Sequence, residues 1–254
     1  MITITLIGAG NVATHLYNAL KKCDTVAVNQ WFSRDLTQIS KYNTEVSITD
    51  NLQELKESDV YIIAISDDAI EDVSKQLPFD NRLVVHTSGS VRLYDIDMKH
   101  HKRGVFYPLQ SFSKAVELNF SEVPICIEAL RKEDFNILKT IGEALGCKVH
   151  KVNTNQRKAL HLAAVFANNF TNQIYRLAHE ICESEAADFD ILKPLIKETA
   201  RKINTVSPYK AQTGPAKRGD KKTIKKQLKM LDNDMQKDVY ELLTKSIKQT
   251  HGQH

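Results

Sequence analysis

The sequence predicts an α/β fold, in which a doubly wound and mostly parallel sheet is followed by an all-helical C-terminal domain. Short apolar runs such as 60–65 and 83–85 alternate with helical segments up to about residue 152, which is typical of parallel strands buried on both faces. A glycine-containing loop at 8–13 joins the first strand to the first helix. Beyond residue 152 the apolar residues recur at helical spacing. We therefore expect one domain over 1–152 and a helical domain over 153–254.

The elements follow from the periodicity of the apolar residues. Strands are expected over 2–7, 25–32, 60–65, 83–85, 104–107, 123–127 and 147–152. Helices are expected between them over 11–22, 70–76 and 133–145. The segment 155–184 contains no Gly or Pro and predicts one helix of nearly thirty residues. Further helices are expected over 189–204, with an interruption near Pro194, and over 220–231 and 234–249.

Composition excludes several classes of protein. The net charge of +4 among 254 residues is too small to indicate nucleic-acid binding by itself. The four cysteines are scattered, so a zinc or other metal site is not expected, and a reduced, cytoplasmic setting is the simplest interpretation. No apolar run approaches the ~20 residues that span a bilayer, and the first residues lead us to expect no signal peptide. We expect neither nucleic acid nor membrane as a partner.

The loop Gly8-Ala9-Gly10-Asn11-Val12-Ala13 has the Gly-x-Gly-x-x-Ala pattern that Rossmann domains use for dinucleotides. Gly8 permits the tight turn, Gly10 lets a pyrophosphate approach the backbone, and Ala13 keeps the helix close to the strand. The helix that begins here presents unpaired N–H groups to the phosphates. We expect Gly8, Gly10, Asn11 and Val12 to bind the cofactor, although small residues in an ordinary strand–turn–helix would give the same pattern.

The end of the second strand favours NADP over NAD. An NAD site usually carries Asp or Glu here, on the adenine ribose, whereas this chain has Ser33 and Arg34. A hydroxyl can donate to a 2′-phosphate, and a guanidinium can pair with the phosphate and stack on adenine. Asp35 follows directly and leaves NAD open. The alternative is that Ser33 and Arg34 only begin a surface loop.

Polar residues follow the fourth strand, where a doubly wound sheet forms its ligand crevice. Ile65, Ser66 and Asp67 are therefore candidates to flank the cofactor. Asp68 is either part of this group or only the cap of the helix that follows.

Two more loops end at the same edge of the predicted sheet, His86–Ser90 and Tyr107–Ser113. Both carry hydroxyl groups, and we expect Ser88 to position the substrate and Gln110 to contact it. Both segments could also be plain connections, with Ser90 capping a helix.

The long helix carries polar residues within an apolar stretch. His161, Val165, Asn168 and Asn172 share one face at α-helical spacing, and Asn169 lies beside them. Two Asn residues in tandem are unfavourable in a helix and need a reason. In one interpretation His161 donates a proton or polarises a carbonyl, while Asn168 and Asn169 orient the substrate. In the other, the cluster forms buried hydrogen bonds between helices, including those of a dimer.

The turn region 211–220 joins two of the predicted helices. Arg218, with Lys217 and Thr213 nearby, is a candidate to bind an acidic substrate or the cofactor phosphate. The alternative is a structural loop in which Asp220 caps the next helix. The lysines that follow are interpreted as a solvated helix face, because no aromatic residues are interleaved to stack on bases.

Five segments, in the order GAGNVA, HTSGS, YPLQSFS, LHLAAVFANNFTN and AQTGPAKRGD, resemble a family of Rossmann-like proteins with a helical C-terminal domain that was long catalogued as of unknown function. The family is similar in layout to pyrroline-5-carboxylate reductases, deazaflavin-dependent NADP oxidoreductases and 6-phosphogluconate dehydrogenases. Some members resemble an alternative ketopantoate reductase. The resemblance implies an NADP-linked reductase that forms a homodimer through its helical domain.

One feature of the related hydroxyacid dehydrogenases is missing. They carry a catalytic Lys on the long helix with Asn four residues later, whereas Lys158 is followed at that spacing by Leu162. His161 occupies a comparable place. We therefore expect hydride transfer from NADPH to a carbonyl group, or less readily an imine, of a small acidic metabolite, with ketopantoate as a candidate. A non-catalytic NADP-binding regulatory protein and an NADP:deazaflavin oxidoreductase are the alternatives.

Overall fold

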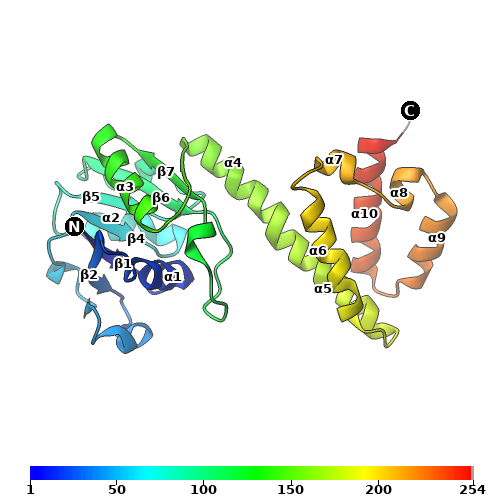
Figure 1. Ribbon diagram of the computed structural model, residues 1–254, viewed down its shortest axis with the longest axis horizontal. Coiled ribbons are helices and arrows are strands. Elements are labelled where there is room, and N and C mark those ends of the chain that lie inside the picture. The colour runs from blue at the N-terminus through cyan, green and yellow to red at the C-terminus, as the bar shows by residue number, and fades with distance from the viewer. Residues whose placement is uncertain (253–254) are drawn as a thin grey trace. The chain divides into compact units, whose positions relative to one another are not determined.

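A computed structural model describes residues 1–252 and confirms the predicted fold class (Figure 1). Its eight strands form one sheet in the order β3-β2-β1-β4-β5-β6-β7-β8. All neighbouring strands are parallel except β6 and β7. The strands are β1 (Ile2–Ile7), β2 (Val26–Phe32), β3 (Ser47–Thr49), β4 (Val60–Ile63), β5 (Leu83–His86), β6 (Lys102–Pro108), β7 (Ile125–Ala129) and β8 (Val149–Lys151).

Three helices belong to the sheet region, α1 (Asn11–Leu20), α2 (Ile70–Gln76) and α3 (Lys132–Ala144). Successive residues of β4 show how they cover it. Ile62 packs in a buried cluster with Leu16 of α1 and Leu138 of α3, whereas Ile63 packs in a second cluster with Ile70 of α2. The sheet is thus buried on both faces, as expected for a doubly wound fold.

A long helical segment begins after the sheet, as α4 (Thr154–Ala164), a π-helix (Val165–Phe170) and α5 (Thr171–Ser184). The remaining helices are α6 (Lys193–Lys202), α7 (Pro208–Ala211), α8 (Pro215–Arg218), α9 (Lys221–Met230) and α10 (Asp234–His251). α4 begins at a capping box, in which the Asn153 side chain accepts from Gln156 N and the Gln156 side chain from Asn153 N.

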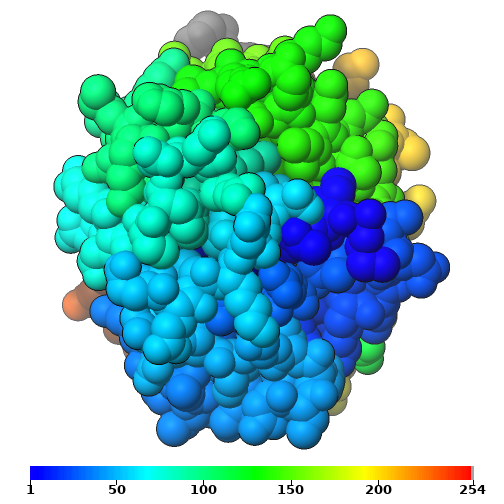
Figure 2. Space-filling view, turned by 90° about the vertical axis from the view of Figure 1, so that its left-hand side faces the viewer, coloured from blue at the N-terminus to red at the C-terminus, as the bar shows by residue number. Residues whose placement is uncertain are grey.

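The chain forms two compact units, an N-terminal unit from Met1 to Asn168 and a helical unit from Asn169 onward. Strands give way to helices between β8 and α4, which is where the sequence changes character at residue 152. A domain boundary at 152 stays a prediction. Figure 2 shows one face of the N-terminal unit, on which the early segments (blue) border later ones (cyan and green).

The N-terminal unit holds the only tryptophan of the chain, Trp31 on β2. It is fully buried and stacks on Tyr17 of α1 with 4.5 Å between the ring centroids. Its indole Nε1 donates a hydrogen bond of 2.6 Å to the carbonyl oxygen of Gly8. The aromatic core thus supports the turn between β1 and α1 directly.

Candidate functional site

The turn between β1 and α1 has the backbone that its glycines predict. Gly8 has φ +117°, and a Cβ placed there would lie 2.2 Å from the carbonyl oxygen of Ala64, so only glycine fits. Gly10 has φ −73°, and no atom lies within 4 Å of the position of its Cβ. Ala13 is fully buried. Gly8 therefore serves the turn itself, and Gly10 leaves the backbone accessible at the start of α1.

A cavity of about 1000 Å³ lies at this turn, at the carboxyl ends of β1, β2 and β4. Eight of the residues predicted to bind the cofactor line it, namely Gly8, Gly10, Asn11, Val12, Ser33, Arg34, Ile65 and Ser66. Asp67 does not line it, whereas Asp68 and Thr87 do. Asp68 lies inside a short 3₁₀ turn and caps no helix. The cavity has room for a dinucleotide along the sheet edge.

The three residues after β2 differ in whether their side chains are already hydrogen bonded within the chain. The Asp35 carboxylate accepts from the backbone N and hydroxyl of Thr37, at 3.0 and 2.6 Å, and these bonds lower its pKa. The Ser33 hydroxyl donates to the Asp35 carbonyl oxygen at 2.8 Å and is nearly buried. Arg34 is exposed and forms no ion pair within residues 1–252. The guanidinium is thus the group that remains available to a 2′-phosphate.

The loop after β5 is held by its own hydroxyl groups. The Ser88 hydroxyl accepts from the backbone N of Ser90 at 3.1 Å and of Val91 at 3.0 Å. The Ser90 hydroxyl donates to the Asp67 carboxylate, which joins this loop to the one after β4. Ser88 is almost buried. Its hydroxyl therefore fixes the loop.

His161 of α4 packs directly on this loop. A Cβ added to Gly89 would lie 2.6 Å from both Cγ and Nδ1 of the imidazole, so any larger side chain would displace the ring. Nδ1 lies 3.0 Å from the hydroxyl of Tyr107 on β6. Burial raises the pKa of Tyr107 to about 12, with the nearby Cys126 thiol adding to the effect. The phenol is therefore protonated at neutral pH and able to donate to Nδ1.

The fully buried Arg157, one helical turn before His161, forms hydrogen bonds to the same loop. Its guanidinium donates to the carbonyl oxygens of Ser88 at 3.0 Å and Gly89 at 3.1 Å. It also pairs with Glu128 of β7 at 3.1 Å. The Glu128 carboxylate in turn accepts from the backbone N and the hydroxyl of Thr154, the first residue of α4. Arg157 and His161, four residues apart on one helix face, thus hold the loop together.

His86, at the end of β5, also contacts this loop. It is fully buried, and its Nδ1 accepts from the backbone N of Ser88 at 3.1 Å. Burial, assisted by the charge of Arg157, lowers the pKa of His86 to about 4. The ring is therefore neutral at physiological pH and acts as an acceptor that shapes the loop.

The π-helix corrects one expectation. The common face of His161, Val165, Asn168 and Asn172 assumes 3.6 residues per turn, but residues 165–170 form i→i+5 hydrogen bonds, which widen the turn and shift the rows of side chains. Asn168 and Asn169 are both exposed in this π-helix. Sequence periodicity alone gave no sign of it. π-bulges of this kind are frequent at functional sites.

The other predicted substrate residues are less constrained. Gln110 is exposed after β6, and its side-chain oxygen accepts from Ser111 N at 2.8 Å. Thr213, Arg218 and Asn169 all belong to the helical unit, and all three are exposed there. Asp220 caps α9, because it accepts from Thr223 N at 3.0 Å, and this is the feature named in the alternative interpretation of 211–220 as a structural loop. The structure thus brings Ser88 and His161 together and adds Tyr107, Arg157 and Glu128.

Those three added residues had weak signals in the sequence. Tyr107 stood in a noted loop but without a partner, and Glu128 is an ordinary strand residue. Arg157 lies four residues before His161, so a search for polar residues on the face of His161 toward its N-terminal side would have found it.

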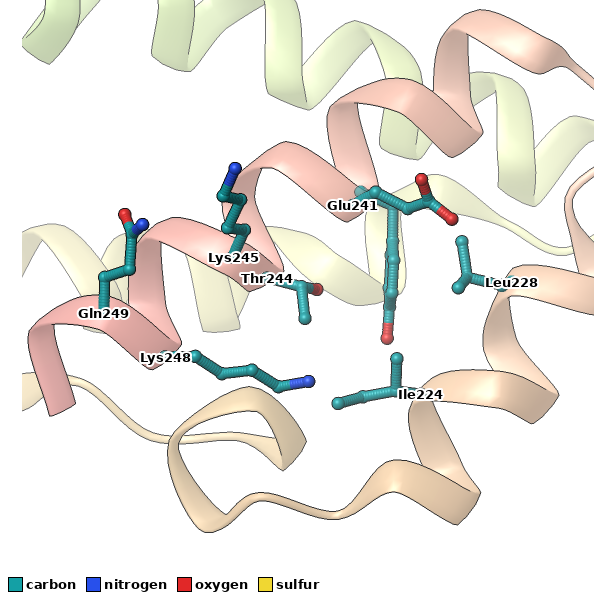
Figure 3. Close-up of a pocket in the computed structure, with 8 residues that line it drawn as sticks. Ile224, Leu228, Glu241, Thr244, Lys245, Lys248 and Gln249 are labelled. Atoms are coloured by element: carbon teal, nitrogen blue, oxygen red, sulfur yellow. The ribbon is translucent and has the colours of Figure 1, made fainter. Parts of the chain in front are cut away.

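A separate hollow of about 540 Å³ lies between α9 and α10 in the helical unit (Figure 3). Its lining combines apolar side chains with lysines, and Lys248 extends toward Ile224 whereas Lys245 points away from it. None of the predicted site residues lines this hollow. Among residues 1–252 no group of three or more His, Cys, Asp or Glu side chains could hold a metal ion, and no helix is long and apolar enough for a bilayer crossing.

Two family models match the chain. Residues 3–89 match the family described as NADP oxidoreductase coenzyme F420-dependent. Residues 123–247 match a domain of unknown function, DUF2520. A search of curated protein sequences gives no match.

Solved structures match over nearly the whole chain. A "putative NADP oxidoreductase" from Bacteroides fragilis is 40% identical, with 98% of each chain covered and a TM-score of 0.88. A pyrroline-5-carboxylate reductase from Streptococcus pyogenes is 11% identical, with 98% of each chain covered and a TM-score of 0.67. An imine reductase from Streptomyces aurantiacus is 11% identical, with 98% of this chain and 95% of that chain covered and a TM-score of 0.75. The last two likenesses concern the fold.

Proposed function

Because the chain belongs to the family of NADP oxidoreductases represented by its Bacteroides fragilis relative, we propose that it reduces a carbonyl group of a small acidic metabolite with NADPH. Ketopantoate is the first substrate to test. One observation carries the proposal. The loop after β5 lines the dinucleotide cavity through Thr87 and, two residues later, contacts the Tyr107–His161 pair through Gly89. A cofactor and a proton donor are thereby supported by the same short segment.

The residues of the cavity fit NADP. We propose that Gly8, Gly10, Asn11 and Val12 hold the pyrophosphate at the start of α1. Arg34 pairs with the 2′-phosphate, and Ser33 shapes the turn that presents it. Ile65, Ser66 and Thr87 flank the remainder of the cofactor. When bound, NADPH supplies the hydride.

The proton is supplied by His161. Tyr107 donates to Nδ1, so Nε2 carries a hydrogen that can bond to the substrate carbonyl oxygen. As the hydride reaches the carbonyl carbon, negative charge grows on the oxygen, and the Nε2–H group stabilises it. The proton then passes from Nε2 to the oxygen while Nδ1 takes the proton of Tyr107. The products are the alcohol and NADP⁺, and solvent reprotonates the tyrosinate.

The other predicted residues orient the substrate in this proposal. In the N-terminal unit, Asn168 and Gln110 offer amide groups to a substrate. In the helical unit, Asn169 and Thr213 offer an amide and a hydroxyl group, and Arg218 offers a cation that suits a carboxylate. Asp67 and Ser88 act through the loop they stabilise.

Turnover is tested by mixing the protein with NADPH and ketopantoate, then with a panel of small oxo acids and cyclic imines, and following the absorbance of the reduced nicotinamide. We expect His161→Ala to lower kcat by about 100- to 10,000-fold, the usual contribution of general acid catalysis. Tyr107→Phe should lower it less, because Nε2 is retained. NADPH affinity should change by no more than about twofold in both variants, since neither residue lines the cavity and their bond is to each other and not to the phosphate loop. Loss of NADPH affinity with intact turnover would refute the role of His161.

Two further outcomes separate the alternatives. NADPH binding without turnover across the whole panel would favour a regulatory protein. Hydride exchange between NADP and a deazaflavin is a second candidate, which the match of residues 3–89 to the coenzyme F420-dependent family favours. A deazaflavin that co-purifies with the protein and is reduced by NADPH would support it.

Cofactor preference is tested by thermal shift, because a ligand that binds the native state raises its stability. We expect a larger shift with NADPH than with NADH at equal concentration. Arg34→Ala should remove most of this difference. A larger shift with NADH would overturn the assignment of the 2′-phosphate site.

We also propose that the enzyme works in the cytoplasm as a homodimer formed through the helical unit. Leu195 of α6 and Leu242 of α10 are 62% and 67% exposed. An apolar hollow of about 360 Å³ lies between α5, α9 and α10. A second copy of the same chain would cover such apolar surfaces, and it is always present at the same concentration as the first.

A further inference from the structure

The segment Phe112–Lys114 lies across the phosphate loop and the first turns of α1. Asn11 Nδ2 donates to the carbonyl oxygen of Phe112 at 2.9 Å, and His15 Nε2 lies 2.9 Å from the carbonyl oxygen of Ser113. Lys114 Nζ donates to the carbonyl oxygen of Ala9, again at 2.9 Å. Three successive residues are therefore attached to the turn that defines the dinucleotide site.

The Phe112 side chain anchors the segment. Its ring lies 5.4 Å from that of His15 and 6.2 Å from that of Phe120, measured between centroids, and it packs against the main core. Residues 111–117 are otherwise largely exposed. The position of Lys114 is thus set by an apolar anchor two residues earlier.

The Lys114 ammonium has bonding capacity to spare. An ammonium carries three N–H donors, and the contact with Ala9 uses one. Within residues 1–252 it forms no ion pair with a carboxylate. The first turn of α1 holds no acidic residue either. A positive charge without a carboxylate partner is therefore bonded to the Ala9 carbonyl of the phosphate loop, although the Lys114 side chain itself lines a neighbouring cavity beside α1 and not the cavity of the predicted cofactor residues.

We propose that Lys114 binds the pyrophosphate of NADP, and that Phe112–Lys114 is the strap that holds it over the phosphate loop. The inference rests on the NADP site proposed above. The backbone N–H groups at the start of α1 supply neutral donors, and Lys114 adds the cation that makes the bond to a phosphate oxygen charge-assisted.

The experiment measures the dissociation constants of NADPH and NADH by fluorescence titration in Lys114→Met, Lys114→Arg and wild type. Lys132→Met is the matched control, because Lys132 is exposed on α3 and has the same charge. We expect Lys114→Met to weaken both cofactors by about 10- to 100-fold, the usual range for a hydrogen bond to a charged group. Lys114→Arg should restore most of the affinity, and Lys132→Met should change nothing.

The two cofactors separate this role from that of Arg34. Both contain a pyrophosphate, so Lys114→Met should weaken both equally, whereas Arg34→Ala should weaken NADPH alone. The effect of Lys114→Met should also shrink at high salt, since screening weakens the lost contact in wild type. Unchanged affinities in Lys114→Met, or a loss confined to NADPH, would overturn the inference. Failure of wild type to bind NADPH would instead overturn the proposed cofactor site.

Discussion

The two units of the chain bury their apolar side chains to very different extents. The N-terminal unit contains all three clusters of buried apolar residues, with β-strand side chains packed on both faces of the sheet. In the described part of the helical unit the buried apolar residues are Leu177, Ala216 and Ile224. Large apolar side chains there remain mostly exposed, among them Ile191 at 74% and Leu195 at 62%.

The difference shows what each unit needs in order to be stable. Burial of apolar area is the main favourable term in folding, and the N-terminal unit obtains it within one chain. The helical unit has amphipathic helices but few positions at which their apolar faces are covered. The homodimer proposed above would cover these faces, so we expect the stability of the helical unit to depend on protein concentration.

The largest expected effect comes from placing charges on the helical unit. Leu195→Glu combined with Leu242→Glu should raise the dimer dissociation constant by at least about 10,000-fold, or about 5.5 kcal/mol, because two carboxylates would be buried at the seam. Sedimentation equilibrium measures this change. Met98→Glu is the control in the N-terminal unit, where Met98 is 78% exposed. An unchanged dimer in the double variant would place the seam elsewhere.

The next largest effect is expected from removing the buried charge of Arg157 in the N-terminal unit. Arg157→Met should lower the free energy of unfolding by about 4 kcal/mol, because it leaves the Glu128 carboxylate without its buried partner. Denaturant titration measures it, and adding Glu128→Gln should recover part of the loss. The control is Arg201→Met in the helical unit, whose pair with Glu198 is exposed to solvent and should change the free energy of unfolding very little. Equal losses in the two units would contradict the contrast in packing.

His86 makes the stability of the N-terminal unit depend on pH. Its pKa is lowered from 6.5 to about 4 in the folded chain, so the unfolded state binds the proton first as pH falls. The free energy of unfolding should therefore fall between about pH 6.5 and pH 4 by up to about 3 kcal/mol, at about 1.4 kcal/mol per pKa unit. His86→Gln should reduce the slope over that range in denaturant titrations, with a smaller remainder from His100, whose pKa is also lowered by burial. A matching change for His101→Gln, at an exposed position, would show that His86 is not the cause.

The smallest effect distinguishes two glycines of the phosphate loop. Gly10→Ala should leave the melting temperature of the free protein nearly unchanged, since its φ of −73° suits alanine and no atom lies near. It should weaken NADPH binding by about tenfold, because the methyl group occupies the approach of the pyrophosphate. Gly8→Ala should instead lower the melting temperature of the free protein, because its Cβ would meet the Ala64 carbonyl. A Gly10→Ala variant with full affinity would contradict the site.

Much of the sheet was predictable because strands buried on both faces leave continuous apolar runs, as in β4 and β5. β3 was missed, because three residues of Ser-Ile-Thr at an edge carry too little pattern. The glycine loop was predictable from its strand–loop–helix context. The direction of the Asp35 carboxylate was not, because its bonds to Thr37 depend on how the turn folds.

The part of the site for which we propose a catalytic role was less accessible to sequence reasoning, for a physical reason. His161 stood out as a histidine among apolar residues, but its contacts with Tyr107 and Gly89 join segments far apart in the chain. The pair of Arg157 and Glu128 likewise forms only when α4 reaches β7. Such partners are set by tertiary packing, and a residue-by-residue pattern does not contain them.

Trp31 gives the molecule a built-in optical probe. It is the only indole in the chain, and its N–H group is bonded to the carbonyl of Gly8, at the start of the phosphate loop. Indole emission should therefore respond when a dinucleotide occupies the loop and should report the melting of the N-terminal unit. Far-ultraviolet circular dichroism records both units, so a mismatch between the two signals on heating would show that the helical unit and the sheet unfold at different temperatures.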